Sequence, residues 1–212
     1  MNLARRVTLA LFLVGSLAGS HSARGAAVEE VFERARAGDV GHLLEMGERA
    51  RGSRDRTVEF AVALALYRSR AGSEYESRLV EAFPTTSSEI ADVYTRLELR
   101  GLAGDFLSWV DDLGDIASRG NGPAVGKMIN GAAHSDGAVA EGFAEQLYLL
   151  LDERRDLTVA TLAQQPPEVK ARVYDGLATT SMTRGKVALW LETASDPKTR
   201  AVLEEMMTHL GE

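Results

Sequence analysis

The chain has 212 residues, carries a formal net charge of −7 and contains no cysteine. The absence of cysteine excludes disulfides and a lipid-modified cysteine anchor. The acidic balance, with no basic run, disfavours nucleic acid and anionic lipid as partners, because both are bound mainly by clustered Lys and Arg.

Residues 1–22 have the order of charged and apolar residues that is typical of a secretory signal peptide. Arg5 and Arg6 form a positive region, residues 7–18 form a short apolar stretch, and small residues follow. A run of about a dozen apolar residues falls short of the roughly 20 that a helix needs to cross a bilayer. We therefore predict a cleavable signal over residues 1–22 and an exported protein, periplasmic or secreted, with no integral membrane segment after cleavage.

Cleavage after residue 22 would remove two arginines and no acid, which moves the formal charge from −7 to −9. Ordinary Sec export is the main interpretation, and a twin-arginine signal built on Arg5 and Arg6 is the alternative. The remaining residues, 23–212, are enough for one sizeable core, so we predict a single domain.

Helix is predicted almost throughout this remaining part. Ala and Leu are abundant, Ile is rare, and no stretch keeps a polar/apolar alternation for long, so the sequence predicts an all-α fold. Helices are expected at about residues 27–37, 39–51, 54–70, 73–82, 87–100, 102–119, 123–133, 136–154, 156–164, 167–178, 185–194 and 197–210.

The residues at the ends of these segments support the helix boundaries. Side chains that accept hydrogen bonds from first-turn amides are expected as N-caps at Ser53, Ser73, Ser87 or Ser88, Ser135 and Asp196. Prolines suited to a first helical turn are Pro123, Pro167 and Pro197. Glycines suited to a left-handed stop are Gly38, Gly52, Gly72, Gly101, Gly120 and Gly211. Residues 60–67 and 143–151 are apolar nearly all the way round a helix, so both are expected to be covered on several sides.

Similar residues recur between the two halves of the chain. The group Val93, Tyr94 and Leu97 recurs with the same internal spacing as Val173, Tyr174 and Leu177. Likewise, the pair Phe60 and Leu64 recurs as Phe143 and Leu147, at a distance along the chain similar to that between the two Val-Tyr-Leu groups.

Prolines precede or begin helices near residues 84, 123, 166 and 197. This spacing resembles that of the two-helix units of HEAT-type repeats, which run to about 40–47 residues, and the resemblance covers roughly residues 27–210. It implies stacked antiparallel helix pairs in an α-solenoid, and a globular helical bundle is the alternative architecture.

Two apparent catalytic motifs do not fit the chemistry that they suggest. Residues 120–128 look like a phosphate-binding loop, but Asn121 stands in place of a Gly and Met128 in place of the Ser or Thr that binds the metal. The run His134, Ser135 and Asp136 contains the three residue types of a catalytic triad, yet consecutive residues cannot face one another in those roles. A helix start and a capping turn are the preferred interpretations.

Metal binding is disfavoured by the spacing of the histidines. His42 and Glu45 share a helix face, but the other histidines outside the signal, His134 and His209, are far away in sequence. A catalytic zinc needs three protein ligands and an open position. We therefore predict no metal and no cofactor, with a surface histidine beside a glutamate as the interpretation of the pair.

The strongest candidate for a binding surface is the acidic stretch around Trp109. Asp111, Asp112 and Asp115 follow this tryptophan, and Asp105 precedes it. Asp111 and Asp115 lie at i and i+4 and repel each other on a helix, so they are suited to a basic partner or a divalent cation. A solvated helix face is the alternative for the acids.

The two tryptophans, Trp109 and Trp190, are candidate interface anchors. Core packing is the alternative, and their apolar neighbours favour it: Leu107, Val110, Leu189 and Leu191.

Two functions fit these observations. The first is a non-catalytic module of the periplasm or cell envelope that binds another exported protein through one face of its helices, with Trp109, Asp111, Asp112 and Asp115 as the binding residues. The second is an extracytoplasmic hydrolase with dispersed carboxylates, for which the available acids are Asp111, Asp115 and Glu141. The lack of a compact catalytic motif favours binding.

Overall fold

The structure, a computed structural model, describes residues 20–51, 55–69 and 73–210. Helices cover about four fifths of the chain, no strand occurs among the described residues, and the predicted all-α fold is confirmed. Of the predicted signal, residues 1–22, positions 1–19 lie outside the described residues. The α-helices are α1 (Ser20–Arg36), α2 (Val40–Ala50), α3 (Arg56–Ser69), α4 (Ser73–Ala82), α5 (Ser87–Arg96), α6 (Phe106–Ser118), α7 (Gly122–His134), α8 (Gly137–Glu153), α9 (Arg155–Leu162), α10 (Pro167–Ala178), α11 (Arg184–Thr193) and α12 (Pro197–His209), with one 3-10 turn, η1 (Glu98–Arg100).

The predicted first helix, 27–37, begins seven residues earlier, at Ser20, and a second boundary error lies between α5 and α6. The predicted helix 87–100 ends instead at Arg96 and continues only as the 3-10 turn, and the predicted helix 102–119 begins late, at Phe106. Gly101 and Gly104 have φ values of 65° and 81°, which a right-handed helix cannot accommodate. Asp105 then caps α6 by accepting a hydrogen bond from the Ser108 amide at 2.8 Å.

The predicted N-caps of α5 and α8 are wrong. Thr86, rather than Ser87 or Ser88, caps α5, because its hydroxyl and the Glu89 side chain each accept a hydrogen bond from the other residue's backbone amide. The Ser135 hydroxyl donates back to the Gly131 carbonyl in α7, so it does not cap α8.

Most other predicted end signals hold. Asp196 accepts from the Thr199 amide at 2.8 Å and caps α12, as predicted. Ser73 is already the first residue of α4, so its prediction as an N-cap is wrong, and Ser53 lies outside the described residues. The three prolines sit in the first turns of α7, α10 and α12. Gly38, Gly101 and Gly120 have positive φ values, whereas residues 52, 72 and 211 lie outside the described residues.

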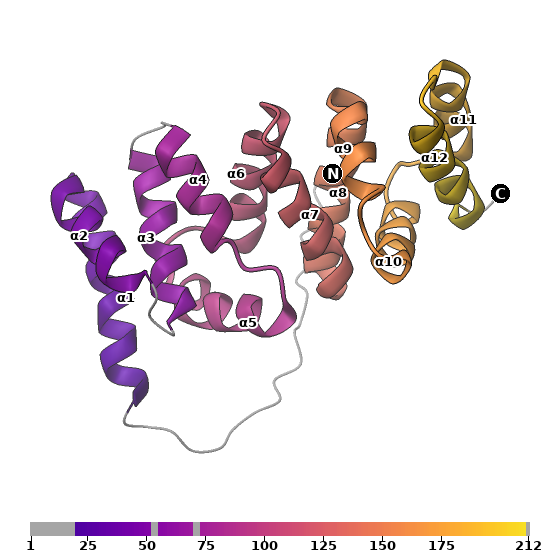
Figure 1. The fold of residues 1–212 in the computed structure, drawn as a ribbon. Helices are drawn as coiled ribbons and strands as arrows, with labels where there is room; N and C mark the ends of the chain where they lie inside the picture. Colours follow the sequence, from indigo (N-terminus) through magenta and orange to yellow (C-terminus); the bar gives the residue numbers. More distant parts are fainter. Residues whose placement is uncertain (1–19, 52–54, 70–72, 211–212) are drawn as a thin grey trace, which may run out of the picture.

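The helices follow one another from α1 to α12 in an extended array (Figure 1). Within the described chain, no two helices more than three places apart in this order pack extensively against each other. For example, α1 packs on α2 and α3, and α7 packs on α6, α8, α9 and α10. Packing between sequence neighbours is the property of a stacked helical array, and it leaves long faces of the helices exposed.

The helices share one continuous apolar core. All residues from Phe60 to Leu66 are buried, so α3 is covered on all sides, as predicted. The second predicted helix, α8, differs, because Glu145 and Leu149 are exposed and give it an outward stripe. Residues 143–151 were expected to be covered on several sides. They are buried on the inward face of α8 but exposed along the outward stripe.

Five aromatic rings form a closed cluster at the centre of this core. Neighbouring rings meet edge to face, with centroids 5.4–6.2 Å apart, in an arrangement that favours the aromatic quadrupoles. The rings come from α3, the segment after α4, α6 and α8, so the cluster joins helices from both halves of the chain. Its members, in order around the cluster, are Phe60, Phe83, Phe143, Phe106 and Trp109.

The residues that recur between the halves have only partly similar surroundings. Val93 and Val173 are both buried. Tyr94 is half-buried on α5, whereas Tyr174 is buried on α10, and its hydroxyl donates to Glu205 at 3.4 Å. Among the described α-helices, α5 packs extensively only on α3 and lies across its end in Figure 1, whereas α10 packs on α7, α8 and α12.

Glycines allow the close approach of helices around the aromatic cluster. A Cβ atom at Gly131 of α7 would lie 2.4–2.6 Å from three ring atoms of Phe143. A Cβ atom at Gly142 of α8 would lie 2.6 Å from the Leu107 side chain of α6. Distances below 3.0 Å are not tolerated without movement, and the Phe143 ring is buried, so Gly131 sets the spacing of α7 on α8. At Gly142 the contact is with the end of the exposed Leu107 side chain, which is free to move.

Alanine at Gly131 is expected to destabilise the protein, because the Phe143 ring is fixed by its aromatic neighbours and cannot move aside. We expect a loss of about 1–3 kcal/mol in the free energy of unfolding, measured by urea denaturation. Gly126 on the same helix is the matched control, since nothing lies within 4 Å of its added Cβ. Gly126→Ala should raise stability by about 0.5–1 kcal/mol through helix propensity. Equal effects of the two substitutions would contradict the proposed close approach.

Candidate functional site

Trp109, a predicted binding residue, is fully buried. Its ring packs between Phe60 and Phe106, and its Nε1–H donates to the Ala103 carbonyl at 2.8 Å. The interface-anchor interpretation is therefore wrong for Trp109, which belongs to the core. Trp190 is buried as well, with 8% of its surface exposed.

Asp112 is committed to a contact within the chain. Arg68 from the end of α3 donates to this carboxylate through Nε at 2.8 Å and Nη2 at 2.6 Å. The same guanidinium donates to the Ala103 carbonyl at 2.6 Å and to the Ser108 hydroxyl at 3.2 Å. Arg68 thereby ties α3 to the start of α6, and Asp112 is the counter-charge that holds it.

Burial raises the pKa of Asp112 above its ordinary value, although the hydrogen bond and charge of Arg68 act in the opposite direction. The neighbouring carboxylates Asp115 and Asp111 raise this pKa further. Because the pKa of Asp112 is raised overall, folding disfavours the ionised form of this side chain.

Asp111 and Asp115 lie on the outer side of α6 and are exposed. Asp111 accepts a hydrogen bond from Gln146 of α8 at 2.7 Å. Of the four predicted binding residues, the structure therefore leaves these two available to a partner.

α6 and α8 run side by side in the same direction. Leu107 lies over Gly142, Asp111 contacts Gln146, and Arg154 donates to the Ser118 carbonyl. Asp115 lies one turn beyond Asp111, and Leu149 lies about one turn beyond Gln146. The register therefore places Asp115 and Leu149 at the same height along the two helix axes.

These two helices together account for the entire charge imbalance of the chain. α6 contains three aspartates, α8 contains four acids, and neither contains Lys or Arg. Because the chain has 31 acids and 24 Lys and Arg, all other residues together carry 24 acids and 24 bases. The two helices therefore concentrate acidic residues in one region of the molecule.

Leucine side chains are exposed among these acids. Leu107 on α6 and Leu149 on α8 are 50% and 46% exposed. We define the acidic face by exposed residues of the two helices, Leu107, Asp111, Asp115, Glu141, Glu145, Leu149 and Glu153. Glu145, Glu153 and both leucines are not predicted from the sequence as members of a surface. The signal that could have revealed the surface is the complete lack of Lys and Arg in two long helices.

A lysine from α11 marks one edge of the acidic face. The Lys186 ammonium pairs with Asp152 and donates to the Tyr148 hydroxyl at 2.8 Å. It also lies 5.7 Å from the centroid of the Trp190 ring. Asp152 is thereby neutralised and is not counted in the face.

Glu141, the third acid of the hydrolase alternative, borders a groove between α7, α8 and α10. This groove is lined also by Arg172 and Asp175, and Arg172 donates to the Ala133 carbonyl at the end of α7. Asp111 and Asp115 are not among its lining residues. The three predicted catalytic acids thus do not converge in this groove.

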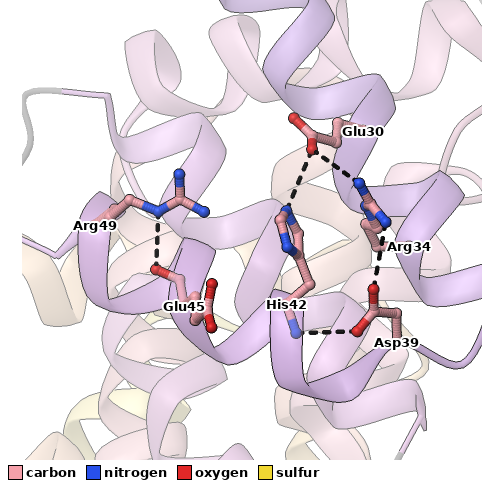
Figure 2. Close-up of polar contacts among 6 residues, drawn as sticks. All are labelled: Glu30, Arg34, Asp39, His42, Glu45 and Arg49. Carbon is pink, nitrogen blue, oxygen red and sulfur yellow. Dashed lines mark hydrogen bonds and ion pairs between the residues drawn. The ribbon is translucent and has the colours of Figure 1, made fainter.

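His42 faces Glu30 of α1 rather than its predicted neighbour Glu45 (Figure 2). Its Nε2 lies 3.2 Å from Glu30, which Arg34 also approaches at 3.7 Å. Asp39 caps α2 by accepting from the His42 amide at 3.1 Å. The cluster is a polar clasp between α1 and α2, and the sequence-based pairing of His42 with Glu45 is wrong.

The two rejected catalytic motifs have structural roles. Asn121 caps α7 by accepting from the Ala124 amide, as expected for a helix start. Lys127 donates to the carbonyls of Glu81 and Phe83, so it closes the end of α4. The His134 carbonyl accepts from the Ser87 hydroxyl of α5.

Among the described residues, no group of three or more His, Asp or Glu side chains could hold a metal ion. None of the described helices is long and apolar enough to cross a membrane. Comparison with protein-family profiles, curated proteins and solved structures finds no match. Function is therefore inferred from the geometry and charge of this chain.

Asparagine at position 112 tests the structural role of Asp112. Because the folded pKa is raised, the ionised carboxylate opposes folding at neutral pH, and this opposition disappears as the pH falls below the ordinary carboxylate range. Asp112→Asn should therefore match the wild type in the free energy of unfolding near about pH 3 and equal or slightly exceed it near about pH 7. Arg68→Ala should be destabilising, because it leaves Asp112 without its counter-charge. Urea denaturation at both pH values gives the comparison, and a large loss at neutral pH in Asp112→Asn would contradict it.

Proposed function

We propose that this protein is an exported, non-catalytic interaction module that binds a basic segment of another exported or envelope protein on its acidic face. The observation that carries the proposal is the concentration of the five exposed acids of the acidic face on α6 and α8, which contain no Lys or Arg. A single-sign surface attracts oppositely charged partners and raises the association rate.

The exposed leucines support a protein partner rather than a small cation. Leu107 and Leu149 are flanked by hydrated carboxylates, which gives an apolar contact with a charged rim. In protein interfaces, buried apolar anchors contribute most of the affinity, whereas rim charges mainly set association rate and salt dependence. A basic segment with apolar residues at helical spacing has the complementary pattern.

The extended array supports the same function. Packing between sequence neighbours leaves α6 and α8 side by side, so a partner segment has several helical turns to contact. Stacked helical arrays present such extended surfaces in general.

The capture of partners from envelope extracts tests this function. Replacing Leu149 with Ser should weaken capture about tenfold or more, since a buried anchor contributes about 2 kcal/mol. Neutralising Asp111, Asp115 and Glu145 as amides should weaken capture modestly, and more at low salt than at high salt. Captured proteins are quantified by mass spectrometry against the wild-type chain.

Two controls match these variants. Leu189→Ser changes a leucine that is 62% exposed on α11, outside the acidic face. Amide substitutions at the exposed residues Glu33, Glu168 and Glu192 remove the same charge elsewhere. Equal capture by face and control variants would contradict the proposed surface. Turnover in a hydrolase screen that Glu141→Gln abolishes would instead establish the enzymatic alternative.

Export is the second part of the proposal and rests on residues 1–22. When the chain is expressed with these residues, we expect it in the periplasmic or secreted fraction, with a new N-terminus between residues 19 and 28. N-terminal sequencing of the recovered protein checks this. Recovery of the uncleaved chain from washed membranes would contradict a cleavable signal.

A further inference from the structure

The two exposed leucines of the acidic face lie along the side of α8 that contacts α6. The Leu107 Cδ2 atom would lie 2.6 Å from a Cβ atom at Gly142, so this side chain reaches across from α6 onto α8. Leu149 follows Gly142 by about two helical turns and therefore lies at nearly the same angle around α8. The two leucines thus lie on the same side of α8, about 10 Å apart along its axis.

The interval between the two leucines is acidic. Asp111 lies within it, because its carboxylate accepts a hydrogen bond at 2.7 Å from Gln146, which lies about one turn before Leu149. Glu145 is the neighbour of Gln146 on α8 and is exposed. A segment that contacts both leucines therefore passes these carboxylates, and neither helix contains a Lys or Arg to neutralise them.

The separation of the leucines distinguishes a helical partner from an extended one. In an α-helix, residues i and i+7 lie on one face and about 10 Å apart. An extended chain covers this distance in about three residues, and the side chains at i and i+3 of a strand point to opposite faces. Of the two, the helix therefore places apolar side chains on both Leu107 and Leu149 with basic side chains between them.

We propose that the acidic face binds an amphipathic helix of the partner protein that carries apolar residues at i and i+7 and Lys or Arg at i+3 or i+4. The apolar residues contact Leu107 and Leu149, and the cations lie opposite Asp111 and Glu145. The cations complement the charge of the face, and the apolar pair supplies the contact that hydrated charges lack. This inference rests on the proposed function, because it describes the partner of the same face.

Two synthetic peptides test the helical spacing. Both are Ala-rich helices of about 18 residues with a fluorescent label and the same numbers of Leu and Lys. The first carries Leu at i and i+7 with Lys at i+3 and i+4, whereas the second has its second Leu at i+5, which turns that side chain away from the face. Fluorescence anisotropy follows their binding to the purified protein. We expect the first peptide to bind saturably and about tenfold more tightly, because the second contacts only one leucine.

The results separate this inference from the proposed function. Equal affinity of the two peptides would overturn the helical spacing and leave a basic segment of any conformation as the partner. Absence of saturable binding of the first peptide would also overturn the inference. Neither result bears on the proposed function, because the capture of partners from envelope extracts tests that function separately.

Variants of the protein show whether the first peptide occupies this face. Leu107→Ser and Leu149→Ser should each weaken its binding about tenfold and affect the second peptide less. Asp111→Asn should weaken both peptides alike, and more at low salt than at high salt, because the two peptides carry the same charge. Leu189→Ser, which changes a leucine that is 62% exposed on α11, should leave both affinities unchanged. Equal losses in Leu149→Ser and Leu189→Ser would overturn the assignment of the peptide to the acidic face.

Discussion

The closed cluster of five aromatic rings is the constraint on which the rest of the structure depends. Phe60, Phe83, Phe143, Phe106 and Trp109 come from segments before and after the middle of the chain, and each ring meets two others. Because their edges and faces must alternate, the rings fix how α6 lies between α3 and α8. The cluster also explains why helices so close together carry glycine: the Phe143 ring occupies the place of a side chain at Gly131.

This packing brings two acidic helices into contact, which carries an electrostatic cost. Asp111 and Asp115 on α6 and Glu145 and Glu153 on α8 are all exposed. Neither helix contains Lys or Arg. Repulsion between such exposed charges amounts to a few tenths of a kcal/mol per pair in water, so the fold tolerates it. The remaining aspartates differ, since Arg68 pairs with Asp112 and Lys186 pairs with Asp152. The acids without a cationic partner are the hydrated ones, and a basic partner would relieve their repulsion.

Helix positions can be predicted well from the sequence, because caps, prolines and glycines act locally. Thr86 shows the limit: several neighbouring residues can cap α5, and only the direction of the entering chain decides which one does. Only half of the candidate site is predictable. Spacing identifies Asp111 and Asp115, whereas the burial of Trp109 and the pairing of Asp112 depend on α3, which lies much earlier in the chain. The register of α6 on α8 likewise places Leu107 over Gly142, a contact that no local pattern reveals.

The surroundings of the acids favour docking over catalysis. A general acid or base works best when burial or a neighbouring charge shifts its pKa towards the working pH, and when it converges with a second group on one substrate position. Asp111, Asp115 and Glu141 are exposed, and the groove beside Glu141 contains neither aspartate. Burial raises the pKa of Asp112, and this carboxylate is paired with Arg68. A row of hydrated carboxylates beside two exposed leucines supplies long-range attraction and short-range apolar contact, which are the two requirements of a surface that recognises a basic protein segment.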